Sequence, residues 1–265
     1  MRFLLLFLFS LPLFSVQLEE YLSLMDAHPK TLGPLGNHLK DEIEIVLDPE
    51  IILEIQETSE KRLLHQGVPH TLAHEWSRVG IVAEDQYLYW IRDGVIFPFG
   101  IYGTYDRIVW KSGFDGPPGI AIAPLLEKKI VVNLNYRHAT RNWEIELPRG
   151  MRRNGESLRE AAARELQEET GYVLDDALLL GTIAIDSGII STTVPVIVCK
   201  VHSESEPSRE YSEAIIENLS MTPEQLEMAL LQGFWNVSLG ERTIRAHVRD
   251  PFLSYALLHI KLRHW

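Results

Sequence analysis

Residues 150–172, GMRRNGESLREAAARELQEETGY, constrain the fold more than any other stretch of the chain. Ser157 is a suitable N-cap and Glu160 follows three residues later, so the pair forms a capping box at the start of a helix. Gly171 suits the left-handed position that ends a helix. Between these ends, one side is apolar at helical spacing, with Leu158, Ala162 and Leu166. The sequence therefore predicts an amphipathic helix that packs on a core through this face.

The opposite side of this predicted helix is acidic. Glu165, Glu168 and Glu169 stand three and four residues apart, which places their carboxylates within reach of one ion. Three acids so close repel one another without a cation, and hard oxygen ligands are those that magnesium and manganese prefer. The pattern indicates a metal site, and a solvated acidic helix face is the alternative.

The same residues resemble the Nudix box, in which glycine, five residues, glutamate, seven residues, Arg-Glu, an aliphatic residue, any residue, Glu-Glu, any residue, glycine and an aliphatic residue follow in fixed register. The matching positions are Gly150, Glu156, Arg164, Glu165, Leu166, Glu168, Glu169 and Gly171. Average residue usage would give these eight matches by chance with a probability on the order of one in a million. Tyr172 departs from the pattern, because an aliphatic residue is usual there.

The resemblance implies roles for the matched residues. The metal ligands would be Glu165, Glu168 and Glu169 together with the backbone carbonyl of Gly150, and the cofactor would be Mg²⁺ or Mn²⁺. Arg164 would pair with Glu156 and hold loop and helix together. The catalytic set that the resemblance implies is Arg164, Glu165, Glu168, Glu169 and, from a later loop, Glu213.

The resemblance also implies an enzymatic activity. The chain is similar to the ADP-ribose and sugar-nucleotide pyrophosphatases, which implies hydrolysis of a nucleoside diphosphate linked to another moiety, ADP-ribose or a nucleotide sugar, by metal-activated water. The alternative is a catalytically silent Nudix-like module that binds a nucleotide or a protein. A third hypothesis is a membrane-tethered scaffold whose helix is merely acidic. Degenerate relatives usually lose one of the paired glutamates or the Arg-Glu step, and this chain keeps them all, so catalysis is favoured.

Residues outside the box extend the resemblance over roughly residues 85–262. Tyr136-Arg137 and WEIELPRG are similar to the stretch before the box, where an arginine contacts substrate phosphates. Arg137 is the matching residue, with Glu146 as a further acid near the substrate. Glu213 best fits the general base, and Glu210 is the reserve candidate. After the box, Ser187 stands where the ADP-ribose enzymes commonly have proline, which leaves nucleotide sugars and other nucleoside diphosphate derivatives open.

The pattern of strands and helices predicts an α/β fold, a mixed-sheet α/β/α Nudix sandwich preceded by a helical and β-hairpin extension. Asp48 and Pro49 open a helix in this extension. The runs YLYWI and VIFPF read as a hairpin with a turn at Arg92-Asp93-Gly94. The sequence predicts a leader over residues 1–16, an N-terminal extension over 17–115 and a catalytic domain over 116–265.

Composition limits the partners. The formal net charge of -12 disfavours an extended nucleic acid, so we expect a small nucleotide substrate. The only cysteine, Cys199, lies in an apolar run and reads as a buried strand thiol. Dimerisation through residues 80–110 is a hypothesis from the family resemblance.

The N-terminal stretch FLLLFLFSLPLFSV has the length and apolar composition of a signal peptide. The alternatives are an uncleaved interfacial anchor and a translation start assigned upstream of the true one. A genuine leader implies a secreted, periplasmic or membrane-anchored protein with membrane contact only through the leader. Without it we expect a cytoplasmic one.

Overall fold

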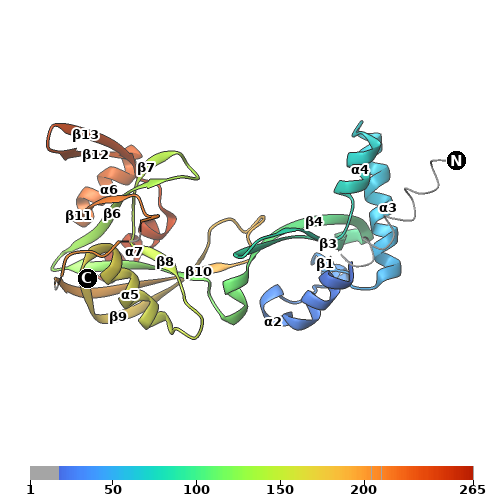
Figure 1. The fold of residues 1–265 in the computed structure, drawn as a ribbon, viewed down its shortest axis with the longest axis horizontal. Helices are drawn as coiled ribbons and strands as arrows, with labels where there is room; N and C mark the ends of the chain where they lie inside the picture. Colours follow the sequence, from blue (N-terminus) through green and yellow to red (C-terminus); the bar gives the residue numbers. More distant parts are fainter. Residues whose placement is uncertain (1–17, 204, 210, 265) are drawn as a thin grey trace. The chain divides into compact units, whose positions relative to one another are not determined.

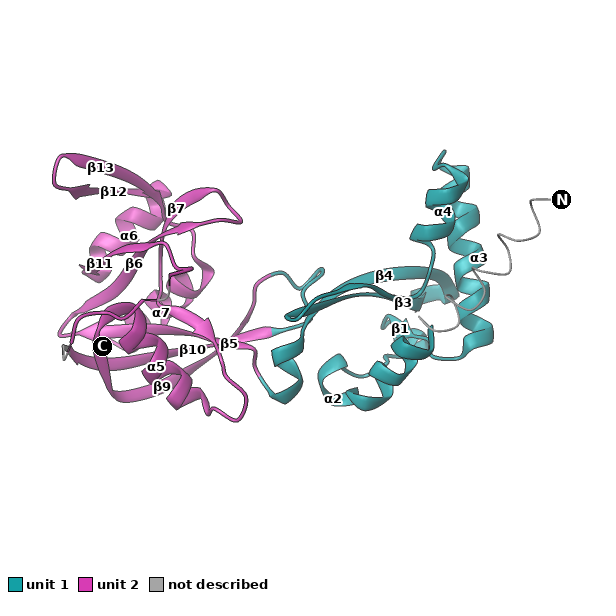
Figure 2. Cartoon of the chain, viewed as in Figure 1, with its two compact units in different colours: residues 1–116, 186–192 teal, residues 117–185, 193–265 magenta. Residues whose placement is uncertain are grey.

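The computed structural model describes residues 18–203, 205–209 and 211–264. It divides into two compact units (Figure 2). Unit 1 comprises residues 1–116 together with 186–192, and unit 2 comprises residues 117–185 and 193–265. The predicted leader lies outside the described residues. Among the helices that the structure describes, none is both long and apolar enough to cross a bilayer.

Unit 1 is a small antiparallel sheet accompanied by helices. Residues 18–27 are helical, and the elements that follow are α2 (Pro29–Leu32), η1 (His38–Lys40), β1 (Glu44–Ile45), α3 (Pro49–His65), α4 (His70–Trp76), β2 (Gly80–Glu84), β3 (Leu88–Phe97), η2 (Pro98–Gly100), β4 (Ile101–Trp110) and η3 (Lys111–Asp115). Strand β3 pairs with β4 and also with β1 and β2. The core of unit 1 includes the fully buried residues Tyr21, Ile52 and Ile91. Asp48 caps α3 through its side chain, as predicted.

The predicted turn at Arg92-Asp93-Gly94 is wrong, because β3 continues through these residues. They pair in register with β4, with Arg92 opposite Asp106 and Asp93 opposite Tyr105. The chain instead reverses in η2, Pro98–Gly100. Cross-strand ion pairs, Arg92 with Asp106 and Asp93 with Arg107, stabilise polar residues in the middle of the strand. Tertiary pairing therefore overrides the local turn preference of Asp-Gly.

Unit 2 contains a mixed sheet. Its elements are β5 (Gly119–Leu126), β6 (Lys129–Arg137), β7 (Asn142–Glu146), β8 (Arg149–Met151), α5 (Leu158–Thr170), β9 (Tyr172–Ala184), β10 (Thr193–Ser203), β11 (Ile215–Met221), α6 (Pro223–Gln232), β12 (Phe234–Leu239), β13 (Arg242–His247) and α7 (Pro251–Leu262). The strand order is β12-β13-β7-β6-β5-β10-β9, with β11 beside β6 and β8 beside β5 (Figure 1). Strand β5 runs parallel to β10, and β13 runs parallel to β7. The β12–β13 hairpin did not appear in the sequence analysis.

Helices cover both faces of the strands β5 and β10. Ile120 and Ile122 belong to one buried cluster with Ala162 and Leu166 of α5. The alternate strand residues belong to another cluster with α6 and α7; among its members are Ala121, Ala123, Leu226, Phe252 and Ala256. Because successive strand residues face opposite sides, the sheet lies between two helical layers. The predicted mixed-sheet α/β/α architecture is confirmed.

The ends of α5 form as the sequence predicts. The Ser157 side chain accepts a hydrogen bond from the Glu160 amide and Glu160 returns one to Ser157, which completes the capping box. Gly171 adopts the left-handed conformation with a φ of 74°. A Cβ at Gly171 would overlap the carbonyl oxygen of Ser205, so only glycine fits where the chain passes the helix end.

Cys199 lies buried in β10, where burial raises the pKa of its thiol to about 12. A thiol with such a pKa stays protonated near neutrality, so it is not a nucleophile. The predicted buried strand thiol is confirmed.

Candidate active site

Three carboxylates come together beside the inner face of α5. Glu165 and Glu169 belong to the helix, and Glu213 lies two residues before β11. Each offers an oxygen atom, and these atoms lie within 4.8 Å of one another. The residues Glu165 and Glu169 are 6% and 3% exposed. Within the part of the chain that the structure describes, no other group of His, Cys, Asp or Glu of this size comes as close together.

Glu169 receives hydrogen bonds from neutral donors. The Asn133 side-chain amide donates to its carboxylate over 2.7 Å, and the backbone amide of Arg149 donates over 3.2 Å. Burial, followed by the charge of Glu213, raises the pKa of Glu169 to about 8. Burial also raises the pKa of Glu165. This set of carboxylate oxygens fits Mg²⁺ or Mn²⁺, which prefer hard oxygen ligands.

Gly150 lies directly against this cluster. It pairs with Ile120 where β8 meets β5. A Cβ on Gly150 would overlap the carboxyl group of Glu165, so any larger residue would displace that carboxylate. The structure thus gives a steric reason for glycine at this position, separate from the metal contact that the resemblance implies for its carbonyl.

Arg164 connects the helix to the loop that precedes it. Its Nε lies 2.9 Å from one Glu156 oxygen and its Nη2 lies 3.0 Å from the other. Its Nη2 also donates to the carbonyl oxygen of Met151 over 2.9 Å, and its Nη1 donates to Glu165 over 2.7 Å. The hydrogen bonds from Arg164 lower the pKa of Glu156 to about 2. The expected ion pair between Arg164 and Glu156 is therefore present, with bidentate geometry.

Glu168 lies apart from the close cluster. Its side chain is 26% exposed and accepts hydrogen bonds from Arg164 over 3.0 Å and from Arg153 over 3.3 Å. Of the three box glutamates, the structure brings Glu165 and Glu169 together and leaves Glu168 among arginines. The third member of the close cluster is Glu213, which the sequence analysis assigned as a base. Glu210, the reserve candidate, lies outside the described residues.

Another buried acid, Glu146, binds two arginines. Its oxygens accept from Arg137 Nη2 over 2.6 Å and from Arg149 Nη2 over 2.7 Å. The Asn135 side-chain amide adds a bond of 2.9 Å. Glu146 is 2% exposed, whereas the Arg137 side chain keeps 36% exposure. Arg137 therefore has both a fixed position and an accessible face, which suits contact with an anion.

Sequence reasoning missed several polar residues of this region: Asn133, Asn135, Arg149 and Asp250. Asn133 and Asn135 alternate with buried apolar residues in β6, and Asp250 is the N-cap of α7 while also binding Arg149 over 3.2 Å. Two polar residues spaced two apart in an otherwise apolar strand must face the same side of the sheet. This spacing could have indicated a polar site on that side. The contact of Asp250 with Arg149 had no local signal.

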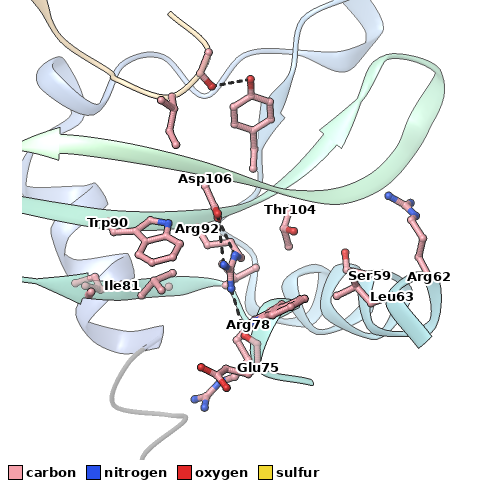
Figure 3. Close-up of a pocket in the computed structure, with 18 of the residues that line it drawn as sticks. Ser59, Arg62, Leu63, Glu75, Arg78, Ile81, Trp90, Arg92, Thr104 and Asp106 are labelled. Carbon is pink, nitrogen blue, oxygen red and sulfur yellow. Dashed lines mark hydrogen bonds and ion pairs between the residues drawn. The ribbon is translucent and has the colours of Figure 1, made fainter. Parts of the chain in front are cut away.

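Unit 1 contains a cleft of about 1140 Å³. Figure 3 shows the side chains around this cleft, which come from α3, from the end of α4 and from the sheet. Arg92 lies among them, near the centre of the view. Arg92 is already engaged, because it donates to Asp106 over 2.8 Å and to the carbonyl oxygen of Glu75 over 3.3 Å. The cleft lacks a close group of metal-binding side chains among the described residues. The close group of possible metal ligands among the described residues is the one in unit 2.

A family model for the NUDIX domain matches residues 117–237. The chain is 27% identical over 104 residues to the ADP compounds hydrolase NudE of Escherichia coli (strain K12), which covers 39% of this chain and 54% of that protein. It is 33% identical over 91 residues to a methanol dehydrogenase activator of Bacillus methanolicus, covering 34% of this chain and 49% of that protein. It is 22% identical over 131 residues to the ADP-sugar pyrophosphatase of Mus musculus, covering 47% and 60%.

The chain thus spans about half the length of the curated relatives it matches. A crystal structure of an ADP compounds hydrolase superposes with a TM-score of 0.52 at 20% identity, over 70% of this chain and 92% of the other. At that identity the likeness concerns the fold. The matched segment 117–237 contains α5 and all three carboxylates of the close cluster.

Proposed function

Since residues 117–237 are a NUDIX domain, we propose that this chain is a metal-dependent hydrolase that cleaves a nucleoside diphosphate linked to another group. ADP-ribose or a nucleotide sugar is the proposed substrate. The observation that carries the proposal is the meeting of Glu165, Glu169 and Glu213 at the helix of the box. The names of the similar proteins, ADP compounds hydrolase and ADP-sugar pyrophosphatase, support the substrate class.

The proposed metal is Mg²⁺ or Mn²⁺. The residues that would hold it are Glu165, Glu168, Glu169 and the carbonyl of Gly150. When bound, such an ion polarises the phosphate oxygens and lowers the pKa of a coordinated water. Glu168 would exchange its hydrogen bonds with Arg153 and Arg164 for metal contact. The positive ion would also relieve the repulsion between Glu169 and Glu213.

The proposed reaction is attack by water on a phosphorus of the diphosphate. The water oxygen forms a bond to phosphorus while the bridging phosphorus–oxygen bond breaks, and Glu213 accepts the proton that the water loses. Arg137 binds the phosphate oxygens, and Glu146 fixes the orientation of that guanidinium. Arg164 acts indirectly, since it holds the loop around Glu156 against α5. No covalent nucleophile takes part.

The test is product release from ADP-ribose, ADP-glucose, GDP-mannose, dinucleotides and nucleoside triphosphates with magnesium. The full chain is compared with Glu169→Gln and with Glu227→Gln, a matched control whose glutamate pairs with Lys261 on the surface. Selective turnover of one class, lost in Glu169→Gln and kept in Glu227→Gln, is expected. Absence of turnover with magnesium and with manganese would favour the silent binding module.

The assembly is a separate proposal. Residues 80–110 carry exposed apolar side chains, including Val82, Trp90, Ile101 and Tyr105. A sheet that leaves such side chains exposed has apolar surface for a second copy to cover. We therefore retain dimerisation through this region as a proposal, and a monomeric mass in light scattering would refute it.

A further inference from the structure

A relay of side chains links the segment before β11 to the acid cluster. The Arg209 guanidinium donates through Nη2 to the side-chain oxygen of Asn218. Asn218 donates to Asn133 over 2.7 Å, and Asn133 donates to the Glu169 carboxylate over 2.7 Å. Strands β11 and β6 place Asn218 directly opposite Asn133. Arg209 is thus connected to the most buried acid of the cluster through two amides.

The other two donors of Arg209 reach backbone atoms on two different elements. Its Nε donates over 3.1 Å to the carbonyl oxygen of Glu169, near the C-terminal end of α5. Its Nη1 donates over 3.1 Å to the carbonyl oxygen of Ile215, the first residue of β11. A cation at a helix C-terminus is also favoured by the helix dipole. One guanidinium therefore joins the end of α5 to the start of β11.

Glu213 lies inside the segment that these bonds enclose. It follows Arg209 by four residues and precedes Ile215 by two. The carbonyl oxygen of the next residue, Ala214, accepts a hydrogen bond from the Tyr136 amide over 3.2 Å. Holding such an irregular segment in one conformation costs conformational entropy, which charge-assisted hydrogen bonds offset. The position of Glu213 next to Glu169 thus depends on anchors on both sides of it.

We propose that Arg209 is a positioning residue that fixes Glu213 in the acid cluster and orients the Glu169 carboxylate through Asn218 and Asn133. This proposal rests on the proposed function, since it concerns the same site. Arg209 acts through Glu213 and Glu169, since its hydrogen bonds go to two backbone oxygens and to Asn218. Its loss would let the Glu213 carboxylate move away from Glu165 and Glu169.

Arginine is required by the geometry. Its planar group directs three nitrogens at Glu169, Ile215 and Asn218 at once. A lysine ammonium keeps the charge but is a single point on a flexible stem, so it cannot satisfy three separated acceptors in this arrangement. Arg209→Lys is therefore the informative variant, because it removes the geometry and keeps the charge.

The test uses the full chain with Arg209→Lys, Glu213→Gln and the double variant. The matched control is Arg159→Lys, because Arg159, an exposed residue of the same unit, also donates to a backbone oxygen, that of Asp175, over 2.7 Å. Two quantities are measured. The first is Mn²⁺ affinity in the absence of substrate, from the electron paramagnetic resonance signal of free Mn²⁺. The second is kcat and KM on the best substrate of the panel.

The expected result is weaker Mn²⁺ binding by about tenfold in Arg209→Lys. We also expect a loss of about tenfold to a hundredfold in kcat, because displacing one reacting group by about 1 Å has effects of this size. KM stays within about threefold. In the Glu213→Gln background, Arg209→Lys causes a smaller loss in kcat than in the wild type, since only its effect through Glu169 remains. Arg159→Lys changes neither quantity.

Wild-type Mn²⁺ affinity and kcat in Arg209→Lys would overturn the proposal. So would losses from Arg209→Lys and Glu213→Gln that multiply, since independent effects mean that Arg209 does not act through Glu213. If the intact chain turns over no substrate, the proposed function fails while Mn²⁺ affinity alone decides this proposal. If Arg209→Lys does not fold, Asn218→Ala breaks only the relay, and an unchanged Mn²⁺ affinity in that variant would contradict it.

Discussion

Two buried acids, Asp93 in unit 1 and Glu169 in unit 2, have opposite kinds of partners. In unit 1, Asp93 is 1% exposed and accepts hydrogen bonds from Arg107 and from the Tyr21 hydroxyl, so a cation within the chain balances its charge. In unit 2, Glu169 is 3% exposed and accepts from an asparagine and a backbone amide, with Glu213 close by. A buried charge without a partner is costly. The difference indicates that Asp93 stabilises the sheet of unit 1, whereas Glu169 is arranged for an external cation, unlike Glu146 of the same unit, which pairs with two arginines.

The largest expected effect comes from removing the charge of Glu169. Glu169→Gln keeps the size of the side chain and loses the ligand, so we expect kcat/KM to fall by roughly 1000-fold. Folding should be retained or improved, because a neutral amide is cheaper to bury than a carboxylate. Activity assays and chemical unfolding check both parts. If the Glu169→Gln variant is active, or does not fold, then Glu169 does not differ from Asp93 in the way proposed.

The reverse result is expected for Asp93→Asn in unit 1. The variant leaves the Arg107 guanidinium with a neutral partner, which lowers the free energy of unfolding by about 3 kcal/mol. That figure is at the lower end for a buried pair, since the Arg107 side chain keeps 16% exposure. Mn²⁺ affinity should not change. Unfolding in urea measures the first quantity, and a stability equal to that of the wild type would contradict the structural role of the pair.

The metal-free protein should lose stability as the pH rises. Burial and Glu213 raise the pKa of Glu169 from 4.5 to about 8. An acid with a raised folded-state pKa contributes stability that is present below its unfolded pKa and is lost as the pH rises through the folded one. With chelator, the melting temperature should fall between about pH 5 and about pH 8.5, and magnesium should restore it most at the higher pH. A melting temperature of the wild type that does not change with pH in the presence of chelator would contradict an uncompensated charge on Glu169.

The smallest expected effect concerns Glu156, which has its own cation. Hydrogen bonds from Arg164 lower its pKa from 4.5 to about 2. The stability that this pair contributes is fully present above about pH 4.5 and is lost as the pH falls through about 2. Glu156→Gln should therefore lower the unfolding midpoint near neutrality and flatten the acid side of the stability profile. Identical acid profiles for variant and wild type would show that the pair adds nothing to folding.

Local signals predicted the elements that carry the box. The predicted ends of helix α5 were both correct, because Ser157, Glu160 and Gly171 act through neighbours within the same turn. The mixed α/β class was also correct, since alternation and apolar runs are local patterns. The Asp93-Gly94 turn was wrong because the pairing of Arg92 and Asp93 across β3 and β4 outweighed the local preference of Asp-Gly.

The acid cluster could be predicted only in part. Glu165 and Glu169 share a helix, so their spacing predicted their proximity. Glu213 is far from them along the sequence, and only the family resemblance suggested it. The relay through Arg209 joins positions on three elements that meet only after the sheet forms, so no spacing rule could reveal it.

The most direct test of the central claim is a calorimetric titration of the full chain with Mn²⁺, with and without the Glu169→Gln substitution. We expect saturable binding to the wild type, with release of protons near pH 7.5, and at least a tenfold loss of affinity in the variant. Equal affinity in both proteins, or no binding to the wild type, would contradict the claim that the carboxylates of unit 2 hold a divalent cation.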